Sequence, residues 1–324
     1  MITIAGAGLA GLSSALELAR RGAAVRVFEA NPSIGAGSVS RFAGGMLAPW
    51  CERESADEAV VTLGAQAADW WGRITQVSRL GTLVVAPTRD SAELTRFSRR
   101  TSAHRAVDQA EITTLEPALA GRFSHGLLYE QEAHLNPRMA LLDLAKAVKD
   151  LGVEIVLGTK APAQVDLDCT GASASVTDLR FVRGEMAILS CPEVAINRTV
   201  RLLHPRIPLY VVPRGEGVYM IGATMVESTS TRPPTLRSLS ELFNAAFTLN
   251  PAFAEAAVIE TGAGLRPAFP DNLPRLVKND GRLHFNGLYR HGFLLAPALA
   301  VQAAQLILSE TSHANHRQSN TANH

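Results

Sequence analysis

The sequence has few cysteines and almost no net charge. Its three cysteines, Cys51, Cys169 and Cys191, are scattered over 324 residues. An odd, scattered set predicts neither a disulfide framework nor a C-x-x-C metal site, and it fits a reducing compartment. The net charge of +1 gives no reason to expect nucleic acid or an anionic membrane as a partner.

The two ends of the chain also lack particular signals. Ile2 already belongs to the first expected strand, so we expect no targeting segment and a cytoplasmic protein. The most apolar late run, residues 294–308, is shorter than the ~20 residues of a membrane span, which indicates a packed helix. We expect the polar residues 311–324 to form a disordered tail. Its His313 and His316 lack the further ligands that a metal site needs.

A glycine pattern lies near the start of the chain. A short apolar run, residues 2–5, turns at Gly6-x-Gly8-x-x-Gly11 into a segment with helical apolar spacing. Gly6 permits a tight turn, Gly8 lets a pyrophosphate approach the main chain, and Gly11 lets helix and strand pack closely. The helix N-terminus offers N–H donors to phosphates. The pattern therefore predicts the βαβ opening of a dinucleotide-binding fold.

An acidic residue ends the second expected strand. Residues 24–28 form that strand, and Glu29 follows it, eighteen residues after Gly11. A carboxylate at this position accepts hydrogen bonds from ribose hydroxyls and disfavours NADP, because the 2′-phosphate would be repelled. This context strengthens the glycine motif; a glycine-rich helix entry without a ligand is the less favoured alternative.

A second stretch of small residues, Ala-Gly-Gly-Met-Leu, lies at residues 43–47. Small residues allow a flat ligand to approach closely, and the serine and arginine before them supply donors. With this stretch the chain resembles the D-amino-acid oxidase superfamily, and in particular the glycine oxidases of thiamine biosynthesis. Segments at 183–189, 208–214, 217–225, 264–267 and 288–297 resemble glycine oxidase in order and spacing.

The resemblance implies FAD as the cofactor and no metal. It also implies that residues 43–47 pass along the flavin ring and that a T-G turn lies near the dinucleotide. The residues expected to contact FAD are Gly6, Ala7, Gly8, Leu9, Ala10, Gly11, Glu29, Ala30, Ser40, Arg41, Ala43, Gly44, Gly45, Met46, Thr170, Gly171, Arg290, His291, Gly292, Phe293 and Leu294.

The expected fold class is α/β, with a discontinuous Rossmann-type FAD-binding domain and a second α+β substrate domain built on an antiparallel sheet. The FAD-binding domain comprises residues 1–50, 135–180 and 275–310, and the substrate domain comprises residues 51–134 and 181–274. The last helix is expected to begin near Pro297, where its N-terminus would stabilise negative charge on reduced flavin.

The substrate site is expected around an arginine. A flavin that oxidises an amino acid needs the Cα–H directed at N5, and a carboxylate is the natural handle. Arg266 suits this role because a guanidinium forms two parallel hydrogen bonds with a carboxylate, and the Tyr210 hydroxyl adds a third donor. Counterparts of both residues hold the carboxylate in the resembled family, where the counterpart of Arg290 lies between substrate and flavin. Taken singly, Arg266 better fits a surface ion pair and Tyr210 a half-buried strand residue, but five motifs in register favour the functional roles.

Two methionines and two histidines each fit either a role at the site or a structural role. Met46 and Met225 match pocket methionines of glycine oxidases, but both equally suit a core position. His134 is a lone histidine for which a satisfied structural role is favoured over catalysis. His291 stands where glycine oxidases often carry asparagine, and we expect its ring to face solvent or the flavin edge without acting as an essential base.

The sequence thus predicts an FAD-dependent oxidoreductase that deaminates glycine or another small amino acid or amine. Hydride passes to flavin N5, an imine forms, and O2 is reduced to H2O2. The resemblance implies that glycine imine is supplied for the thiazole of thiamine, with thiazole synthase as a candidate partner and a homo-oligomeric state. The alternatives are a D-amino-acid or sarcosine-type oxidase or dehydrogenase that uses another acceptor, and a non-catalytic flavoprotein.

Overall fold

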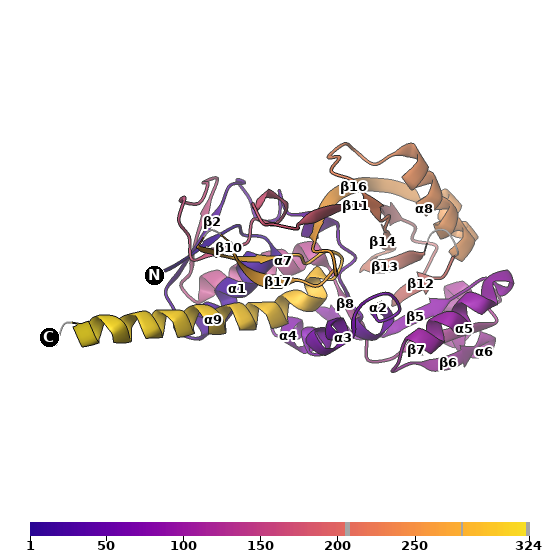
Figure 1. Ribbon diagram of the computed structural model, residues 1–324. Coiled ribbons are helices and arrows are strands. Elements are labelled where there is room, and N and C mark those ends of the chain that lie inside the picture. Colours follow the sequence, from indigo (N-terminus) through magenta and orange to yellow (C-terminus); the bar gives the residue numbers. More distant parts are fainter. Residues whose placement is uncertain (205–207, 280, 322–324) are drawn as a thin grey trace. The chain divides into compact units, whose positions relative to one another are not determined.

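The computed structural model describes residues 1–204, 208–279 and 281–321 and divides into two compact units, each made of separate pieces of the chain (Figure 1). Unit 1 comprises Met1–Arg41, Leu141–Arg180 and Pro267–His324, and unit 2 comprises Phe42–Ala140 and Phe181–Arg266. The sequence placed its domain boundaries at residues 50, 135, 180 and 275. The division into an FAD domain and a substrate domain at those boundaries stays a prediction.

Unit 1 is built on a six-stranded sheet with the order β17-β18-β10-β1-β2-β9. The pairs from β18 to β9 run parallel, and β17 and β18 form an antiparallel hairpin. In a parallel sheet both faces are covered, which is why Ile4 and Val27 are fully buried. The strands are β1 (Ile2–Ala5), β2 (Val25–Glu29), β9 (Glu154–Leu157), β10 (Leu167–Asp168), β17 (Arg275–Asn279) and β18 (Arg282–Asn286).

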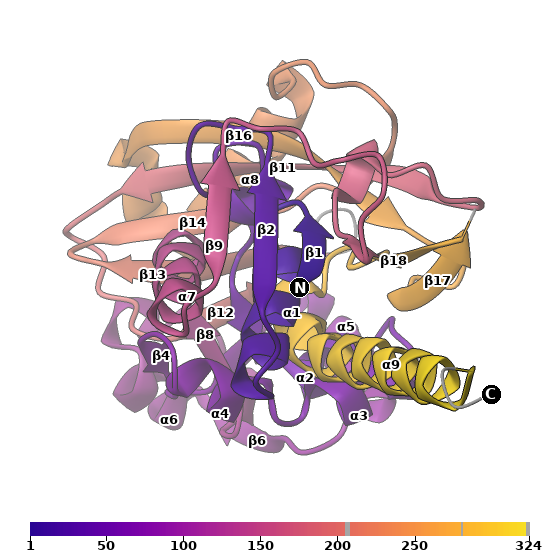
Figure 2. The same ribbon diagram turned by 90° about the vertical axis from the view of Figure 1, so that its left-hand side faces the viewer.

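Two helices of unit 1 pack against each other, α1 (Leu9–Arg20) and α9 (Gly292–Thr321), as Figure 2 shows beside the parallel strands. Leu12 and Leu16 lie one helical turn apart on α1 and are buried. The apolar face predicted after the glycine motif therefore packs into the core. Helix α7 (Pro137–Asp150) runs from one unit into the other.

Helix α9 differs from the prediction at both ends. It begins at Gly292, before the expected start near Pro297, and the proline lies inside the helix. It continues to Thr321, so the main chain of residues 311–321, expected to be disordered, is helical; residues 322–324 lie outside the described residues. Its segment Gly292–Glu310 is long and apolar enough to cross a membrane by length and composition alone. However, 56% of that window is buried, as in a core helix.

Unit 2 contains a nine-stranded sheet with the order β15-β11-β14-β13-β12-β5-β7-β6, in which β16 also pairs with β11. β12 and β5 run parallel, whereas the pairs from β11 to β12 and from β5 to β6 are antiparallel. The strands are β5 (Thr82–Val85), β6 (Arg105–Asp108), β7 (His125–Tyr129), β11 (Arg180–Ser190), β12 (Thr199–Leu202), β13 (Leu209–Gly215), β14 (Val218–Gly222), β15 (Val226–Glu227) and β16 (Ala257–Ala268).

A three-stranded sheet and short helices complete unit 2. The sheet consists of β3 (Met46–Leu47), β8 (Ala133–Leu135) and β4 (Val77–Ser78). The helices are α2 (Pro49–Glu52), α3 (Glu58–Gly64), α4 (Ala67–Gly72), α5 (Ser91–Arg100), α6 (Gln109–Leu115) and α8 (Leu236–Leu249). Unit 2 also has the short 3-10 helices η2 (Thr88–Asp90), η3 (Pro117–Leu119) and η5 (Pro251–Glu255), whereas η4 (Gly171–Ser173) belongs to unit 1 and η1 (Val39–Phe42) spans the boundary between the units in the chain.

The two faces of the larger sheet in unit 2 have different neighbours. On one face, Leu189 of β11 and Ile221 of β14 join a core cluster that includes Leu242 of α8. Because side chains alternate along a strand, Met186 and Met220 point to the other face, where Phe42 and Tyr210 pack against them. This second face carries the candidate substrate residues described below.

Candidate active site

The turn between β1 and α1 has the geometry that a pyrophosphate site needs. Gly6 has φ +92°, a conformation that L side chains rarely adopt, and a Cβ there would lie 2.7 Å from the Cys169 carbonyl oxygen. A Cβ on Gly11 would lie 1.8 Å from the Gly6 carbonyl oxygen. At Gly8 a Cβ would meet the Ser38 Oγ at 3.6 Å, an ordinary contact, so the main chain there is open to a ligand. Gly8 gives α1 no side-chain cap, which leaves the first N–H groups for an anion.

The carboxylate of Glu29 is fixed at the end of β2. Its Oε2 accepts a hydrogen bond from Ala7 N at 2.9 Å, and its Oε1 accepts from Asn31 N at 2.9 Å and Asn31 Nδ2 at 2.6 Å. A carboxylate has about four acceptor positions, so it can still accept from ribose hydroxyls. The structure thus joins Glu29 to the glycine turn; its contact with a ribose stays a prediction, and Ala30 beside it is exposed.

The T-G turn after β10 is held by side chains of unit 1. Asp168 Oδ1 accepts hydrogen bonds from Thr170 N at 3.0 Å and from Thr170 Oγ1 at 2.6 Å. Asn286 Nδ2 donates to the Gly171 carbonyl oxygen at 2.8 Å. This turn follows Cys169, whose N–H donates to the Ala5 carbonyl oxygen at 2.8 Å. The turn therefore follows the strand that lies beside β1; its place near the dinucleotide stays a prediction.

The remaining residues of unit 1 that are predicted to contact FAD lie in η1 and at the start of α9. Ser40 and Arg41 belong to η1, and the Ser40 N–H donates to Ser38 Oγ at 3.3 Å. A Cβ on Gly292 would lie 3.1 Å from Leu9 Cδ2, so the first residues of α9 and α1 are close neighbours. The N-terminal N–H groups of both helices lack intrahelical acceptors, which suits negatively charged groups of a ligand.

His291 is buried, at 3% exposure. Its ring therefore does not face solvent, which was one of the two orientations predicted for it. Its N–H donates to the Leu288 carbonyl oxygen, and its carbonyl oxygen accepts from Leu295 N. His291 Nε2 lies 3.4 Å from Arg290 Nε. The residue therefore closes the turn that starts α9, with Phe293 and Leu294 buried immediately after it.

The loop at residues 43–46 belongs to unit 2, where Arg214 holds it. Arg214 Nη2 donates to the carbonyl oxygens of Ala43 at 3.1 Å and Gly44 at 2.9 Å, and its Nη1 donates to that of Leu135 at 3.0 Å. A Cβ on Gly45, which has φ +72°, would lie 2.3 Å from the same Leu135 oxygen. Burial, with a smaller contribution from the charge of Arg138, lowers the pKa of Arg214 to about 9.

Tyr210 lies against two glycines on the second face of the sheet. Its residue pairs in register with Gly222, and a Cβ on Gly222 would be 3.4 Å from the Tyr210 hydroxyl oxygen. A Cβ on Gly44 would be 3.0 Å from the Tyr210 ring. The absence of side chains at both positions therefore makes room for the ring beside the 43–46 loop.

Arg266 lies on the same part of unit 2 and has no carboxylate partner among the described residues. Its guanidinium covers Gly184, where a Cβ would lie 2.1 Å from Nη2. Its Nη1 donates to the Thr224 carbonyl oxygen at 3.1 Å. Thr224 follows Gly222 by two residues, so one short segment contacts both Arg266 and Tyr210. A half-buried guanidinium with most of its donors open is suited to a carboxylate.

The two methionines differ in their surroundings. Met46 is partly buried and packs against a core cluster that includes Cys51 and Tyr129. Met225 directly follows Thr224 and is 49% exposed. A substrate contact for either side chain stays a prediction.

His134 has the structural burial that was favoured for it but is not fully satisfied. It is 5% exposed, and its Nδ1 has no hydrogen-bond partner among the described residues. It pairs in register with Met46 across the small sheet. Burial, with the nearby charge of Arg214, lowers the pKa of His134 to about 4.

Sequence reasoning missed the residues that hold the predicted ones. Arg214 ends the same Y-x-V-P-R segment that contains Tyr210, and this arginine in a strand was the available signal. Gly184, between Arg183 and Glu185, marks where the Arg266 guanidinium lies. No local pattern indicated Thr224, because its contact with Arg266 joins distant segments.

Comparisons with a protein family, with known sequences and with solved structures agree with this geometry. A family profile described as FAD dependent oxidoreductase matches residues 1–306. The putative thiamine biosynthesis oxidoreductase ThiO of Rhizobium etli is 53% identical over 326 residues, which covers 98% of this chain and 99% of that protein. The bifunctional protein ThiO/ThiG of Nostoc sp. is 28% identical over 359 residues, which covers 96% of this chain and 53% of that protein. The crystal structure of glycine oxidase from Geobacillus kaustophilus matches with a TM-score of 0.81 at 23% identity and covers 95% and 94% of the two chains.

Proposed function

The chain belongs to the family of FAD-dependent oxidoreductases, and we propose that it oxidises glycine or another small amino acid whose carboxylate is held by Arg266. The observation that carries this proposal is the Arg266 guanidinium, which has one main-chain acceptor and no carboxylate partner among the described residues. A half-buried cation without an anion is costly, and a substrate carboxylate would supply the missing charge. The similarity to a thiamine biosynthesis oxidoreductase supports the same class of substrate.

The residues of unit 1 fit FAD. Gly8 and the start of α1 would receive the pyrophosphate, and Glu29 the adenosine ribose. The glycine cradle, which a Cβ at Gly6 or Gly11 would fill, is the observation that tests this fit. When bound, FAD supplies the two-electron acceptor for the hydride from the substrate Cα and returns the electrons to O2 as H2O2.

The proposed substrate residues of unit 2 would hold the substrate and orient it. Arg266 would receive the carboxylate through two N–H donors, and the Tyr210 hydroxyl would donate to the same group. Such anchoring fixes the Cα–H direction, which is the main requirement of hydride transfer. The Cα hydrogen would leave as a hydride, and the lone pair of a neutral substrate amine would form the C=N bond, so no proton has to be removed first and an essential general base is not required. The role of Arg290, between substrate and flavin, stays a prediction.

Water hydrolyses the imine product, so a second enzyme that uses the imine must receive it before it is hydrolysed. A relative of this chain is a bifunctional ThiO/ThiG protein, in which a second part accompanies the part that matches. We propose that the imine serves thiazole formation in thiamine biosynthesis, with thiazole synthase as the partner. The cytoplasmic location and the homo-oligomeric state expected from the sequence stay predictions.

The test is an anaerobic titration of the purified flavoprotein with glycine, sarcosine, D-alanine and D-proline, followed by flavin absorbance. We expect glycine to reduce the flavin and Arg266→Ala to weaken this reduction strongly. Admission of O2 should then restore the oxidised spectrum and yield one H2O2 for each flavin.

Each alternative has its own outcome in this experiment. Failure of all four substrates to bleach the flavin would indicate a non-catalytic flavoprotein. Bleaching by D-alanine or D-proline but not glycine would change the substrate, and slow reoxidation by O2 with fast reoxidation by a quinone would indicate a dehydrogenase.

A further inference from the structure

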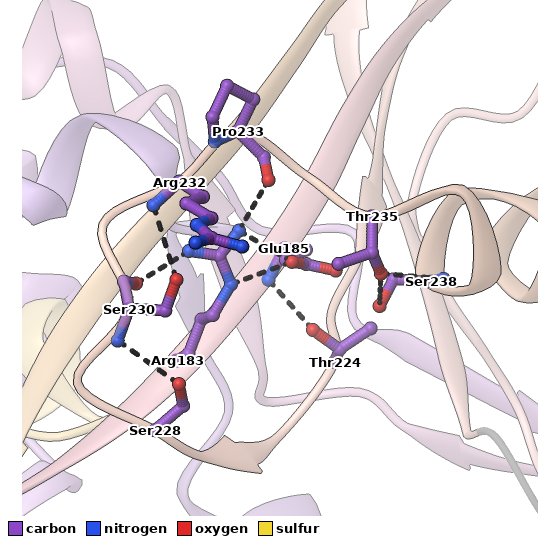
Figure 3. A network of polar contacts seen from close by, with 9 residues as sticks. All are labelled: Arg183, Glu185, Thr224, Ser228, Ser230, Arg232, Pro233, Thr235 and Ser238. Atoms are coloured by element: carbon purple, nitrogen blue, oxygen red, sulfur yellow. Dashed lines mark hydrogen bonds and ion pairs between the residues drawn. The ribbon is translucent and has the colours of Figure 1, made fainter.

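A buried ion pair lies on strand β11, next to the glycine that supports Arg266 (Figure 3). Arg183 Nε donates to Glu185 Oε1 at 2.7 Å, and the two side chains are only 5% and 2% exposed. Arg183 and Glu185 are two residues apart and so point to one face of the sheet, while Gly184 between them belongs to the other face. The pair is thus behind the strand on which the Arg266 guanidinium lies.

Arg183 also holds the segment that leads into α8. Its Nη1 donates to the Ser230 carbonyl oxygen at 2.7 Å, and its Nη2 donates to that of Pro233 at 2.9 Å, as Figure 3 shows. Thr235 then caps α8, because its Oγ1 accepts from Ser238 N at 3.2 Å. One guanidinium therefore contacts two carbonyl oxygens of the segment that leads into α8.

Thr224 connects this arrangement to Arg266. Its Oγ1 accepts a hydrogen bond from Glu185 N at 2.9 Å, and its N–H donates to the Glu185 carbonyl oxygen at 3.2 Å. Its own carbonyl oxygen receives the Arg266 Nη1 hydrogen at 3.1 Å. The acceptor that orients Arg266 is thus fixed to the main chain of Glu185 at two points.

We propose that Arg183, Glu185 and Thr224 are positioning residues for the substrate carboxylate, which act by holding Arg266 in place. The proposal rests on the proposed function, in which Arg266 binds that carboxylate. Buried ion pairs are weak contributors to stability because desolvation opposes their attraction, so stability alone gives little reason for a pair here. A bidentate contact needs a guanidinium placed to within about 0.5 Å, which a supporting layer of locked side chains provides.

The chain offers a matched control in Arg198. Its Nε donates to Glu116 Oε1 at 2.8 Å, and its Nη1 and Nη2 donate to the carbonyl oxygens of Leu80 at 2.8 Å and Leu115 at 3.2 Å. Arg198 thus has the same kinds of acceptor as Arg183, one carboxylate and two carbonyl oxygens, in the same unit. Among the described residues, none of these acceptors has a hydrogen bond with Arg266. Arg183→Met and Arg198→Met therefore remove equivalent interactions.

The experiment is anaerobic stopped-flow reduction of the FAD-loaded variants by glycine, which separates the Kd of glycine from the limiting reduction rate. For Arg183→Met we expect the Kd to rise at least tenfold while the limiting rate stays within about threefold. Arg198→Met should change neither value by more than about twofold. Thr224→Val should raise the Kd, and Thr224→Ser, which keeps the Oγ acceptor, should restore it.

A double-mutant cycle with Arg266→Ala separates positioning from general damage. If Arg183 acts through Arg266, Arg183→Met should change the Kd by less than about twofold once Arg266 is absent. An undiminished effect in that background, or equal effects of Arg183→Met and Arg198→Met, would overturn the proposal. If Arg183→Met does not fold, Arg183→Met/Glu185→Leu, which leaves no unpaired buried charge, and Thr224→Val decide by the same criteria. A glycine Kd unaffected by Arg266→Ala would instead contradict the proposed function.

Discussion

At the scale of single residues, the proposed chemistry depends on the Arg266 guanidinium, which has no carboxylate partner among the described residues. Three other arginines of unit 2 pair with a carboxylate: Arg183 with Glu185, Arg198 with Glu116 and Arg138 with Glu260. Two more, Arg214 and Arg122, donate to two or three main-chain carbonyl oxygens each. Among the described residues, the Arg266 guanidinium donates to one acceptor, the Thr224 carbonyl oxygen. Arg266 thus has fewer acceptors than these arginines, which leaves donors for a ligand.

Replacement of Arg266 should therefore impair substrate binding and turnover without removing the cofactor. We expect Arg266→Ala to lower kcat/KM for glycine by a factor of about 100 to 1,000, or ~3–4 kcal/mol. Arg266→Lys should recover only part, because an ammonium does not provide the bidentate geometry. Steady-state kinetics with measured flavin content test this. Values for Arg266→Ala within about threefold of the wild type would move the handle to another residue.

His291 is the candidate base at the start of α9, and its structure argues for a main-chain role. Its carbonyl oxygen accepts from Leu295 N, a contact that any residue supplies. We expect His291→Asn to keep the rate of flavin reduction by glycine within about tenfold, whereas a true general base contributes ~100–10,000-fold. The pH dependence should follow deprotonation of the substrate amine. A loss beyond a hundredfold, with FAD still bound, would make His291 the base.

At the scale of elements, β8 and the turn before it contain two buried titratable side chains, Glu132 and His134. Their pKa values shift in opposite directions. Glu132 Oε1 accepts from Cys51 N at 2.7 Å and so caps the short helix α2, yet burial raises its pKa from 4.5 to about 7. Two residues later, burial lowers the pKa of His134 from 6.5 to about 4. The neutral form of each is thus the one that the fold favours.

These shifts have opposite consequences for stability. Between pH 4.5 and 7 folded Glu132 keeps a proton that the unfolded chain releases, so its contribution is lost as the pH rises. Between pH 6.5 and 4 unfolded His134 takes up a proton that the folded chain does not, so its contribution is lost as the pH falls. From pH 4.5 to 6.5 the two contributions to the free energy of unfolding change with pH in opposite directions and cancel.

Replacement of one of the two residues should reveal the pH dependence of stability that the other one contributes. For Glu132→Gln we expect the free energy of unfolding to fall by up to about 3 kcal/mol as the pH is lowered from 6.5 to 4.5, relative to the wild type. For His134→Leu it should fall by a similar amount as the pH is raised over that range. Urea unfolding at several pH values measures both. Parallel curves for all three proteins would show that these pKa shifts are absent.

The same scale shows what the sequence could and could not predict. The βαβ opening was predictable, and β1, α1, β2 and Glu29 confirm it, because its signals are local. The start of α9 was not. Proline favours the first helical turn, but at Pro297 only the hydrogen bond to residue 293 is lost, and the turn closed by His291 starts the helix earlier. The contacts of Arg214 and Thr224 join residues far apart in sequence, which no periodicity records.

At the scale of the whole molecule, each unit is assembled from distant pieces of chain. In unit 1, Ile4 of β1 pairs with both Val27 and Leu167. The glycine cradle includes both regions, because Gly6 lies against Cys169, which follows β10. Formation of the dinucleotide site therefore requires most of unit 1 to be folded, and FAD should stabilise that unit by binding its native state.

The protein should accordingly purify yellow, with one non-covalently bound FAD. We expect acid denaturation to release all the flavin as FAD, because Glu29 provides for an adenosine ribose that FMN lacks. Chromatography of the supernatant identifies the flavin. FMN in the supernatant, or flavin that remains on the protein, would contradict the prediction.

Two glycine replacements separate cofactor binding from folding. At Gly8 an added Cβ meets only ordinary contact, with Ser38 Oγ at 3.6 Å, and the φ of −81° suits alanine. Gly8→Ala should therefore fold with native circular dichroism but bind FAD at least tenfold more weakly, because the methyl group occupies the pyrophosphate approach. Gly11→Ala places its Cβ 1.8 Å from the Gly6 carbonyl oxygen, so it should lose the fold as well as the flavin. Fluorescence titration of the apoproteins with FAD measures the first effect, and thermal unfolding without FAD the second. Unchanged FAD affinity in Gly8→Ala would mean that the pyrophosphate does not approach the chain at this turn.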